Sequence, residues 1–405
     1  MSSFLQQSCL DKKYDELVEL LVDHINESDE KPHLQEALLL FIDSVNRLPF
    51  SADFYISGGL SQLLVPLYNL FSPQETKQSV KEHCLVTLGD TLRLVAWADG
   101  EKDELVAREM QDFSHWMDIF ATIIQSDPKK NFYLKSLCIR VLTIIFRDFL
   151  RYSKQYLESH LPKIWKLLTL HLPIYIEVVI HESPESLNCD ASLLDEKSNI
   201  VRMSSELLDF ISSLSHKESL NPIIKTIAVL LISTLSGYAL LPKSEEKRHR
   251  DDATLYINEI QDDLYRGGVR GQAIKLISDV IEKNFEGEAA KTVFLVAVKM
   301  ANSLYKKSDS KLKVWKNEEM LSMTFESLNL ETYQGGYESL NAQHAWKRVE
   351  GGLFILGSFF DDFSGLFQRD PKLSMDLSEL MRDLFSIENF DELSKAEGFE
   401  QLQDY

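Results

Sequence analysis

Paired cysteines are missing from this chain of 405 residues. Its four cysteines, Cys9, Cys84, Cys138 and Cys189, lie far apart, so no Cys-x-x-Cys motif indicates a zinc site or a redox dithiol. Cys84 and Cys138 fall on apolar helical faces, where a free cysteine acts as a small hydrophobic residue. These features favour a reducing compartment, the cytosol or the nucleus.

Long apolar runs are also missing. Runs such as Ile227–Ile232 are far shorter than the roughly 20 apolar residues that cross a bilayer. The first residues, MSSFLQQSC, have neither the basic start nor the apolar core of a signal peptide. We therefore expect a soluble intracellular protein with no membrane insertion.

Motifs for catalysis are absent as well. The chain has no Gly-x-Ser-x-Gly, no His-Glu-x-x-His and no G-x-x-x-x-G-K-[ST] phosphate loop. A glycine cluster, RGGVRG at 266–271, follows no predicted strand. We interpret it as a hinge where an insertion ends and a helix begins near Val269. We expect no enzyme, no cofactor and no metal site.

Charge of one sign is in excess instead. The sequence has 63 acidic against 43 basic residues, a net charge of −20. Such a balance disfavours direct binding to nucleic acid and attracts basic partners over long range. The alternative, that the charge only keeps the protein soluble, stays open on this evidence.

Apolar residues recur with the helical period along most of the chain. Residues 131–150 have the spacing of an amphipathic helix, with apolar side chains at Leu134, Leu137, Cys138, Val141, Leu142, Ile145, Phe146 and Phe149. Sustained alternation of period two and Asn-Gly or Asp-Gly hairpin turns are absent. The β-branched run Ile174–Ile180 continues a helical pattern, so we interpret it as a helix end. The sequence predicts an all-α fold.

The predicted helices form pairs joined by short turns. These pairs are 33–48 with 51–72, 75–97 with 101–126, 130–150 with 153–180, 195–214 with 217–240, 267–285 with 287–305, and 343–364 with 373–388, preceded by a helix at 11–25. Their spacing fits the ~40–47 residue period of HEAT or armadillo repeats. It does so if polar insertions interrupt the repeats at 182–193, 242–266 and 306–340.

We expect the whole chain, 1–405, to be a single HEAT/armadillo-type right-handed α-solenoid of about six helix pairs, with an acidic tail at 391–405. A stack of this kind leaves a long concave surface that binds partners. Candidates for contacting a basic partner are Glu259, Asp262 and Asp263 in the insertion 242–266.

Three of the five tryptophans allow a prediction. Trp165 and Trp346 fall in apolar stripes and are predicted to lie in the core. Trp315, in the insertion 306–340, is either an exposed contact for a partner or a core anchor for the insertion, and both interpretations stay open.

Four passages between about 130 and 365 share a characteristic order and spacing. They are NFYL at 131–134 with LPKIWKLLT at 161–169, IYIEVV at 174–179, YINE at 256–259 with DD at 262–263 and VR at 269–270, and HAWKRVE at 344–350 with LGS at 356–358. Together they resemble the importin-beta (karyopherin-beta) superfamily of nuclear transport receptors, and within it the importin-nine branch.

The resemblance implies a nuclear import receptor without enzymatic activity. Its acidic concave surface would bind basic nuclear cargo such as histones, Ran-GTP would release the cargo, and nucleoporins would be further partners. It also implies shuttling between the cytoplasm and the nucleus, at the nuclear pore and envelope. The alternative is a HEAT-repeat scaffold of a multiprotein complex with no transport role.

Length is where the chain departs from that family. Six helix pairs are fewer than its members have, and the first, Ran-engaging repeats find no counterpart among the matched passages. We therefore expect either a fragment of a longer protein or a short relative that keeps the cargo-side scaffold, and we expect the response to Ran to be lost.

Overall fold

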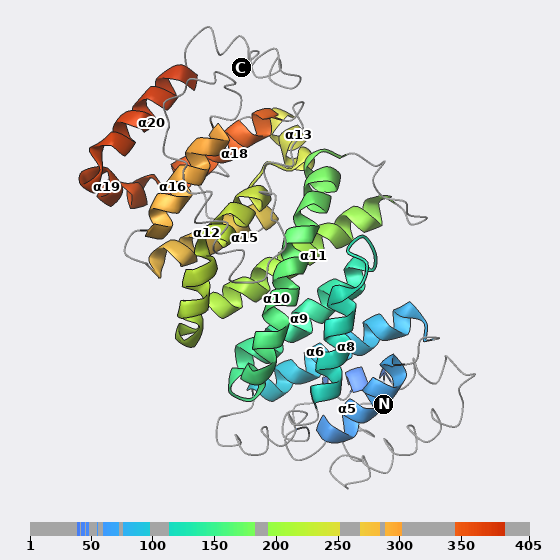
Figure 1. Cartoon of the computed structure of the whole chain (residues 1–405). Coiled ribbons are helices and arrows are strands. Elements are labelled where there is room, and N and C mark those ends of the chain that lie inside the picture. Colours follow the sequence, from blue (N-terminus) through green and yellow to red (C-terminus); the bar gives the residue numbers. More distant parts are fainter. Residues whose placement is uncertain are drawn as a thin grey trace. The chain divides into compact units, whose positions relative to one another are not determined.

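The computed structural model describes residues 39–40, 42–44, 46–47, 55, 60–72, 76–97, 113–182, 193–251, 268–283, 288–301 and 345–384 (Figure 1). Throughout these ranges the regular structure is helical and no β-strand occurs. The chain divides into two compact units, Met1–Ile164 and Trp165–Tyr405. The all-α, HEAT-type fold predicted from the apolar periodicity is confirmed.

The first unit is built from stacked helices. They are α5 (Leu60–Phe71), α6 (Gln78–Trp97), α8 (Ser114–Gln125), α9 (Phe132–Asp148) and the first part of α10 (Leu150–Tyr175). Helix α6 packs on both α5 and α9, and α8 packs on α9. Trp116 of α8 is buried, with its ring centroid 5.7 Å from that of Phe71 and 5.8 Å from that of Phe120. Aromatic packing therefore joins α5 to α8.

The second unit continues with the rest of α10 and a π-helical turn, Ile176–Ile180. Its further helices are α11 (Leu193–Ser215), α12 (Asn221–Tyr238), α13 (Lys243–Asp251), α15 (Val269–Glu282), α16 (Glu288–Ala301), α18 (Ala345–Ser358), α19 (Phe360–Arg369) and α20 (Pro371–Leu384). Helix α11 packs on α15, and α12 packs on α15 and α16. Helix α16 packs in turn on α18 and α19 (Figure 1). Each helix hairpin thus stacks on the next.

The apolar stripes form the core as predicted. Leu137, Cys138, Val141 and Ile145 of α9 are each at most 1% exposed. Burying an aliphatic side chain of this size contributes about 1.5–3 kcal/mol, so helices with such a stripe are stable only when packed together. The core positions predicted for Trp165 and Trp346, and the apolar surroundings predicted for Cys84 and Cys138, are confirmed.

A close approach of two helices fixes the packing of α18. A Cβ atom at Gly352 would lie 2.6 Å from both Ala297 O and Ala301 N in the backbone of α16. No side chain fits in that space, so glycine lets the two backbones come together. This contact holds α18, which carries much of the site described below.

The boundaries differ from the prediction in two places. The helix expected at 343–364 is two helices, because Phe359 leaves the helical region with φ −119° and ψ 19°. The insertion expected at 242–266 begins with the nine-residue helix α13, whose sequence KSEEKRHRD carries no apolar stripe. The predicted helix end at Ile174–Ile180 is confirmed, since α10 runs to Tyr175 and the π-helical turn follows it.

Several predicted segments lie outside the described residues. They are the helix at 11–25, most of the insertion 182–193, residues 252–266 of the second insertion, the insertion 306–340 and the tail 391–405. None of the helices in the described ranges combines the length and the apolar character needed to cross a bilayer.

Candidate protein-binding site

The candidate contact residues belong to two segments outside the described ranges. Trp315 lies in 302–344, and the acidic candidates lie in 252–267, which we name the acidic segment; they are Glu259, Asp262 and Asp263. Their role as contacts stays a prediction. The structure does describe the chain on both sides of the acidic segment, namely α13 before it and α15 after it.

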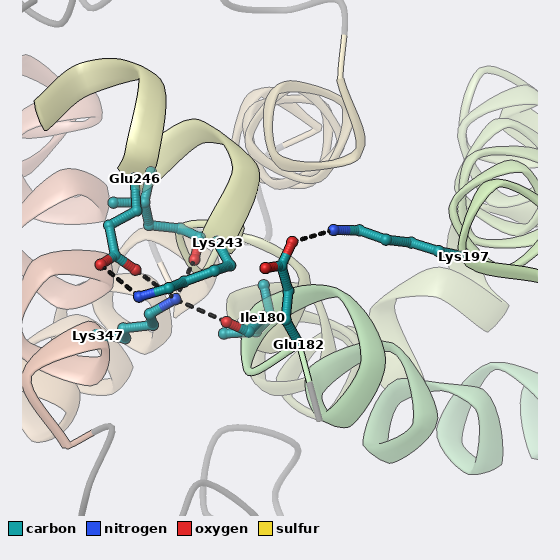
Figure 2. A network of polar contacts seen from close by, with 7 residues as sticks. Ile180, Glu182, Lys197, Lys243, Glu246 and Lys347 are labelled. Carbon is teal, nitrogen blue, oxygen red and sulfur yellow. Dashed lines mark hydrogen bonds and ion pairs between the residues drawn. The ribbon is translucent and has the colours of Figure 1, made fainter. Parts of the chain in front are cut away.

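The chain that leads into the acidic segment is held by a buried carboxylate. Glu246 of α13 is 7% exposed. Its Oε1 accepts a hydrogen bond of 2.8 Å from Lys243 Nζ, and its Oε2 lies 3.0 Å from Lys347 Nζ of α18 (Figure 2). An ion pair therefore joins α13 to a helix that follows much later in the chain.

Lys347 is the centre of this cluster and is fully buried. Besides pairing with Glu246, its ammonium donates hydrogen bonds to Ile180 O at 2.7 Å and to Leu241 O at 3.3 Å (Figure 2). A lysine ammonium has three donors, and these three oxygens match that number. The carbonyl of Ile180 ends the π-helical turn, so Lys347 also caps that turn.

The chain that leaves the acidic segment is held by a second buried ion pair. Arg270, the second residue of α15, is 1% exposed, and its guanidinium lies 2.6 Å from Glu350 Oε1. The same guanidinium lies 3.8 Å from the ring centroid of Phe354, within the range of a cation–π interaction. Lys347 and Glu350 are three residues apart on α18 and so share one face of it.

The two ends of the acidic segment also lie close to each other. A Cβ atom at Gly268 would be 3.7 Å from Glu245 Oε1 of α13. Charged groups from both sides of the acidic segment act on Tyr175. Burial and the Glu245 carboxylate raise the pKa of its phenol, and the Arg270 guanidinium acts in the opposite direction. The predicted helix start at Val269 is confirmed, and Gly268 before it has φ −95°, a conformation open to any residue.

The electrostatics of the cluster depend on the pairing. Burial alone would raise the pKa of Glu246, but the hydrogen bond from Lys243 and the Lys347 ammonium outweigh it and lower that pKa. Burial lowers the pKa of Lys347, and the Glu246 carboxylate opposes this shift. The Glu246 carboxylate is stabilised as an ion by Lys243 and Lys347, and the Lys347 ammonium by Glu246 and two backbone carbonyls. The cluster is therefore a structural support rather than a place where a ligand's charge is bound.

Features of a catalytic or metal site do not stand out in the described residues. No group of three or more His, Cys, Asp and Glu side chains there is arranged to hold a metal ion. Burial raises the pKa of the Cys84 thiol to about 12 and that of Cys138 well above its usual value. A buried thiol of this kind is a poor nucleophile.

The charged cluster was not predicted from the sequence. Arg270, Lys347 and Glu350 stand in the passages VR at 269–270 and HAWKRVE at 344–350, which carry the family resemblance, whereas Lys243 and Glu246 lie in the predicted insertion 242–266. The sequence does not mark Arg270 or Lys347 as buried, because Gln272 follows the first and Arg348 follows the second near the helix start. Their partners could not be predicted, since Arg270 and Glu350 are 80 residues apart in sequence.

Comparison with known proteins adds one further line of evidence. No protein-family model matches the chain. A stretch of 226 residues, 54% of this chain, is 23% identical to Importin-9 of Drosophila melanogaster. The similarity points to the importin-beta superfamily. The matched stretch covers 22% of that relative, so the chain spans only a minor part of its length.

Proposed function

We propose that this chain works as part of a nuclear transport receptor of the importin-beta type and binds a basic protein through the acidic segment. The observation that carries the proposal is the similarity to Importin-9 over 226 residues. The all-α HEAT-type fold supports it, because such stacks are binding scaffolds. No catalytic step is part of the proposed mechanism.

Charge supplies the attraction in this mechanism. The acidic segment contains four acidic residues and one arginine, in a chain of net charge −20. Glu259, Asp262 and Asp263 pair with lysines or arginines of the ligand, and Trp315 of 302–344 adds an apolar contact. Attraction between exposed charges speeds association and weakens as salt rises.

The finer features of the proposal follow the family resemblance. The basic ligand is a nuclear cargo protein such as a histone. In a full-length receptor of the family, Ran-GTP would release the cargo and nucleoporins would guide passage through the pore, whereas we expect this chain to bind cargo without responding to Ran-GTP. The receptor then shuttles between cytoplasm and nucleus.

A direct binding assay tests the proposal. The purified chain is immobilised and offered a core histone at about 50 and 300 mM salt, with and without Ran-GTP. We expect binding that falls several-fold between the two salt concentrations and does not respond to Ran-GTP. Binding that responds to neither salt nor Ran-GTP would instead support a HEAT scaffold of a multiprotein complex.

A variant that neutralises the three acidic candidates tests whether they form the contact. E259Q/D262N/D263N is compared with D118N/E158Q/E379Q, which removes the same charge from exposed positions on α8, α10 and α20. At about 0.2–1 kcal/mol per exposed pair, the first variant loses roughly tenfold in affinity. Equal losses in both variants would mean that overall charge, not the acidic segment, attracts the ligand.

A further inference from the structure

The outward side of α19 has an exposed aromatic side chain. Phe360, the first residue of α19, is 57% exposed. Its ring centroid lies 6.4 Å from that of Phe367, which lies 5.6 Å from that of the buried Phe294 on α16. Helix α19 packs on α16 and α20 (Figure 1). The aromatic core between α16 and α19 therefore continues to the surface at Phe360.

Small residues lie beside Phe360 on the exposed side of α19. Ser364 is about one turn further along the helix, and Gly365 follows it; both are exposed. A Cβ atom at Gly365 would have no neighbour within 4 Å, in contrast to one at Gly352. Glycine weakens a helix interior relative to alanine, and no packing contact among the described helices explains it at position 365. The open space instead allows the backbone of another molecule to approach α19 closely.

Three carboxylates lie close to this exposed side. Asp361 and Asp362 stand in the first turn of α19, and Glu282 ends α15. Partial burial, the Asp361 carboxylate and the Glu282 carboxylate all raise the pKa of Asp362. None of the three carboxylates pairs with a cationic side chain in the part of the chain that the structure describes. Because like charges gather here without a counter-charge, the surface attracts a cationic ligand.

We propose that this surface docks a basic amphipathic helix of a partner protein. We name it the α19 face, and it consists of Glu282, Phe360, Asp361, Asp362, Ser364 and Gly365. Apolar side chains of the ligand pack on Phe360, and its backbone approaches α19 at Gly365. Its lysines or arginines pair with the carboxylates near the start of α19. The α19 face is separate from the acidic segment, so the inference does not depend on the proposed function.

Physical arguments select this occupant over two others. A helical surface offers no free backbone groups to an extended peptide, whereas a helical ligand satisfies its own backbone hydrogen bonds. Symmetric pairing with a second copy of this chain is disfavoured, because the same carboxylates would face each other. An apolar contact and exposed ion pairs are each weak alone, so the ligand needs both an apolar face and basic residues.

A peptide of about 18 residues, made only of leucine and lysine, provides the probe. In one order its leucines form a single helical face, and in a scrambled order of the same composition they do not. Fluorescence anisotropy measures the binding of both peptides to the parent and to F360A, G365L and E282Q/D362N. Circular dichroism and thermal unfolding show whether each variant folds. G365L should fold at least as stably as the parent, because leucine is a better helix former than glycine.

Matched changes at exposed positions of α8 and α10 serve as controls. L170A shortens an exposed apolar side chain, T122L adds a leucine to a helix surface, and D118N/E158Q removes the same charge as E282Q/D362N. The variant E259Q/D262N/D263N shows whether the acidic segment takes part.

We expect the parent to bind the amphipathic peptide roughly fivefold more tightly than the scrambled one. F360A, G365L and E282Q/D362N should each weaken that binding by roughly fivefold, and the three controls by less than about twofold. Because G365L strengthens the helix, a loss of binding in this variant comes from blocking the approach to α19 and not from unfolding.

Several results would overturn the inference. They are a parent that binds neither peptide or binds both equally, α19 variants that bind like the parent, and equal losses in E282Q/D362N and D118N/E158Q. A loss confined to E259Q/D262N/D263N would also overturn it, because the peptide would then occupy the acidic segment. Failure of a histone to bind the parent contradicts the proposed function instead, and the peptide measurements still decide whether the α19 face is a docking surface.

Discussion

Each unit of the molecule contains a fully buried lysine near the start of a helix, and the two are held differently. Lys135 of α9 donates hydrogen bonds to the carbonyl oxygens of Ser126 and Asp127, just after α8. Lys347 of α18 also donates to two carbonyl oxygens, but a carboxylate, that of Glu246, lies 3.0 Å from its ammonium. Both lysines satisfy carbonyl groups at helix ends.

The two lysines differ in how far away in the sequence their hydrogen-bond acceptors lie. The acceptors of Lys135 are eight and nine residues away, so this lysine closes one local turn. The acceptors of Lys347 are 106 and 167 residues away. Such a long-range cap holds together segments that are far apart in the sequence. The buried Glu246 carboxylate also makes the position of the Lys347 ammonium specific. We infer that the first lysine stabilises a hairpin, whereas the second joins α13 and the π-helical turn to α18.

Removing the carboxylate beside each lysine should reveal the largest difference in stability between the two sites. E246L leaves the Lys347 ammonium buried with carbonyl oxygens alone, and breaking a buried pair in this way costs about 3–5 kcal/mol. The matched change near Lys135 is D127N, which keeps the backbone carbonyl that Lys135 uses and should cost less than about 1 kcal/mol. Urea unfolding of both variants measures the difference, and equal losses would contradict it.

Removing each lysine should have a smaller effect. K347M leaves Glu246 with Lys243 as a partner, so we expect a loss of about 2–3 kcal/mol, and K135M about 1–2 kcal/mol. The double variant E246L/K347M should be more stable than E246L alone, because no unpaired charge remains buried. A double variant that loses the sum of the two single losses would show that the pair is not coupled.

One glycine in each unit allows the closeness of helix packing to be compared. A Cβ atom at Gly89 of α6 would lie 3.5 Å from Val141 Cγ2 of α9, an ordinary contact. At Gly352 it would meet the backbone of α16 at 2.6 Å. We expect G352A to lose about 1–3 kcal/mol and G89A to be neutral or up to about 1 kcal/mol more stable. Thermal unfolding checks this, and a neutral G352A would mean that α18 can shift on α16.

The pH dependence of stability should also differ, by the smallest amount. The pKa of Glu246 is lower in the folded state than its usual 4.5, so its stabilising effect is present above pH 4.5 and is lost as pH falls through the folded value. E246Q should therefore lose less stability in acid than the parent. Unfolding in urea at pH 5 and pH 3 measures this difference, and parallel losses would contradict it.

Lys135 should act at the other end of the pH scale. Burial lowers its pKa to about 8 from 10.5, so the folded state releases this proton first. The contribution of Lys135 to stability should therefore rise between pH 8 and 10.5, because the unfolded state still holds the proton there. Lys347, whose pKa is also lowered, adds a rise of the same sign. The difference in stability between the parent and K135M should therefore change with pH between 8 and 10.5, and parallel pH profiles would contradict a lowered pKa for Lys135.

The sequence predicted the local part of this structure well. The stripe of α9 and the core positions of Trp165 and Trp346 follow from helical periodicity, which needs only neighbouring residues. Helix α13 escaped prediction because it has no apolar stripe and is held by the ion pair of Glu246. The cluster around Lys347 was also not predicted. Its partners are distant in sequence, and the sequence of one helix does not show which residue a charged side chain will pair with. The contact residues Glu259, Asp262, Asp263 and Trp315 remain predictions.

Zero-length cross-linking of the chain to a histone most directly tests the claim that a basic protein binds the acidic segment. A carbodiimide joins a carboxylate to a lysine only where the two are in contact, and mass spectrometry identifies both. The account predicts that most cross-links fall on Glu259, Asp262 and Asp263 and disappear at high salt. Cross-links spread evenly over exposed carboxylates such as Asp118, Glu158 and Glu379 would contradict it.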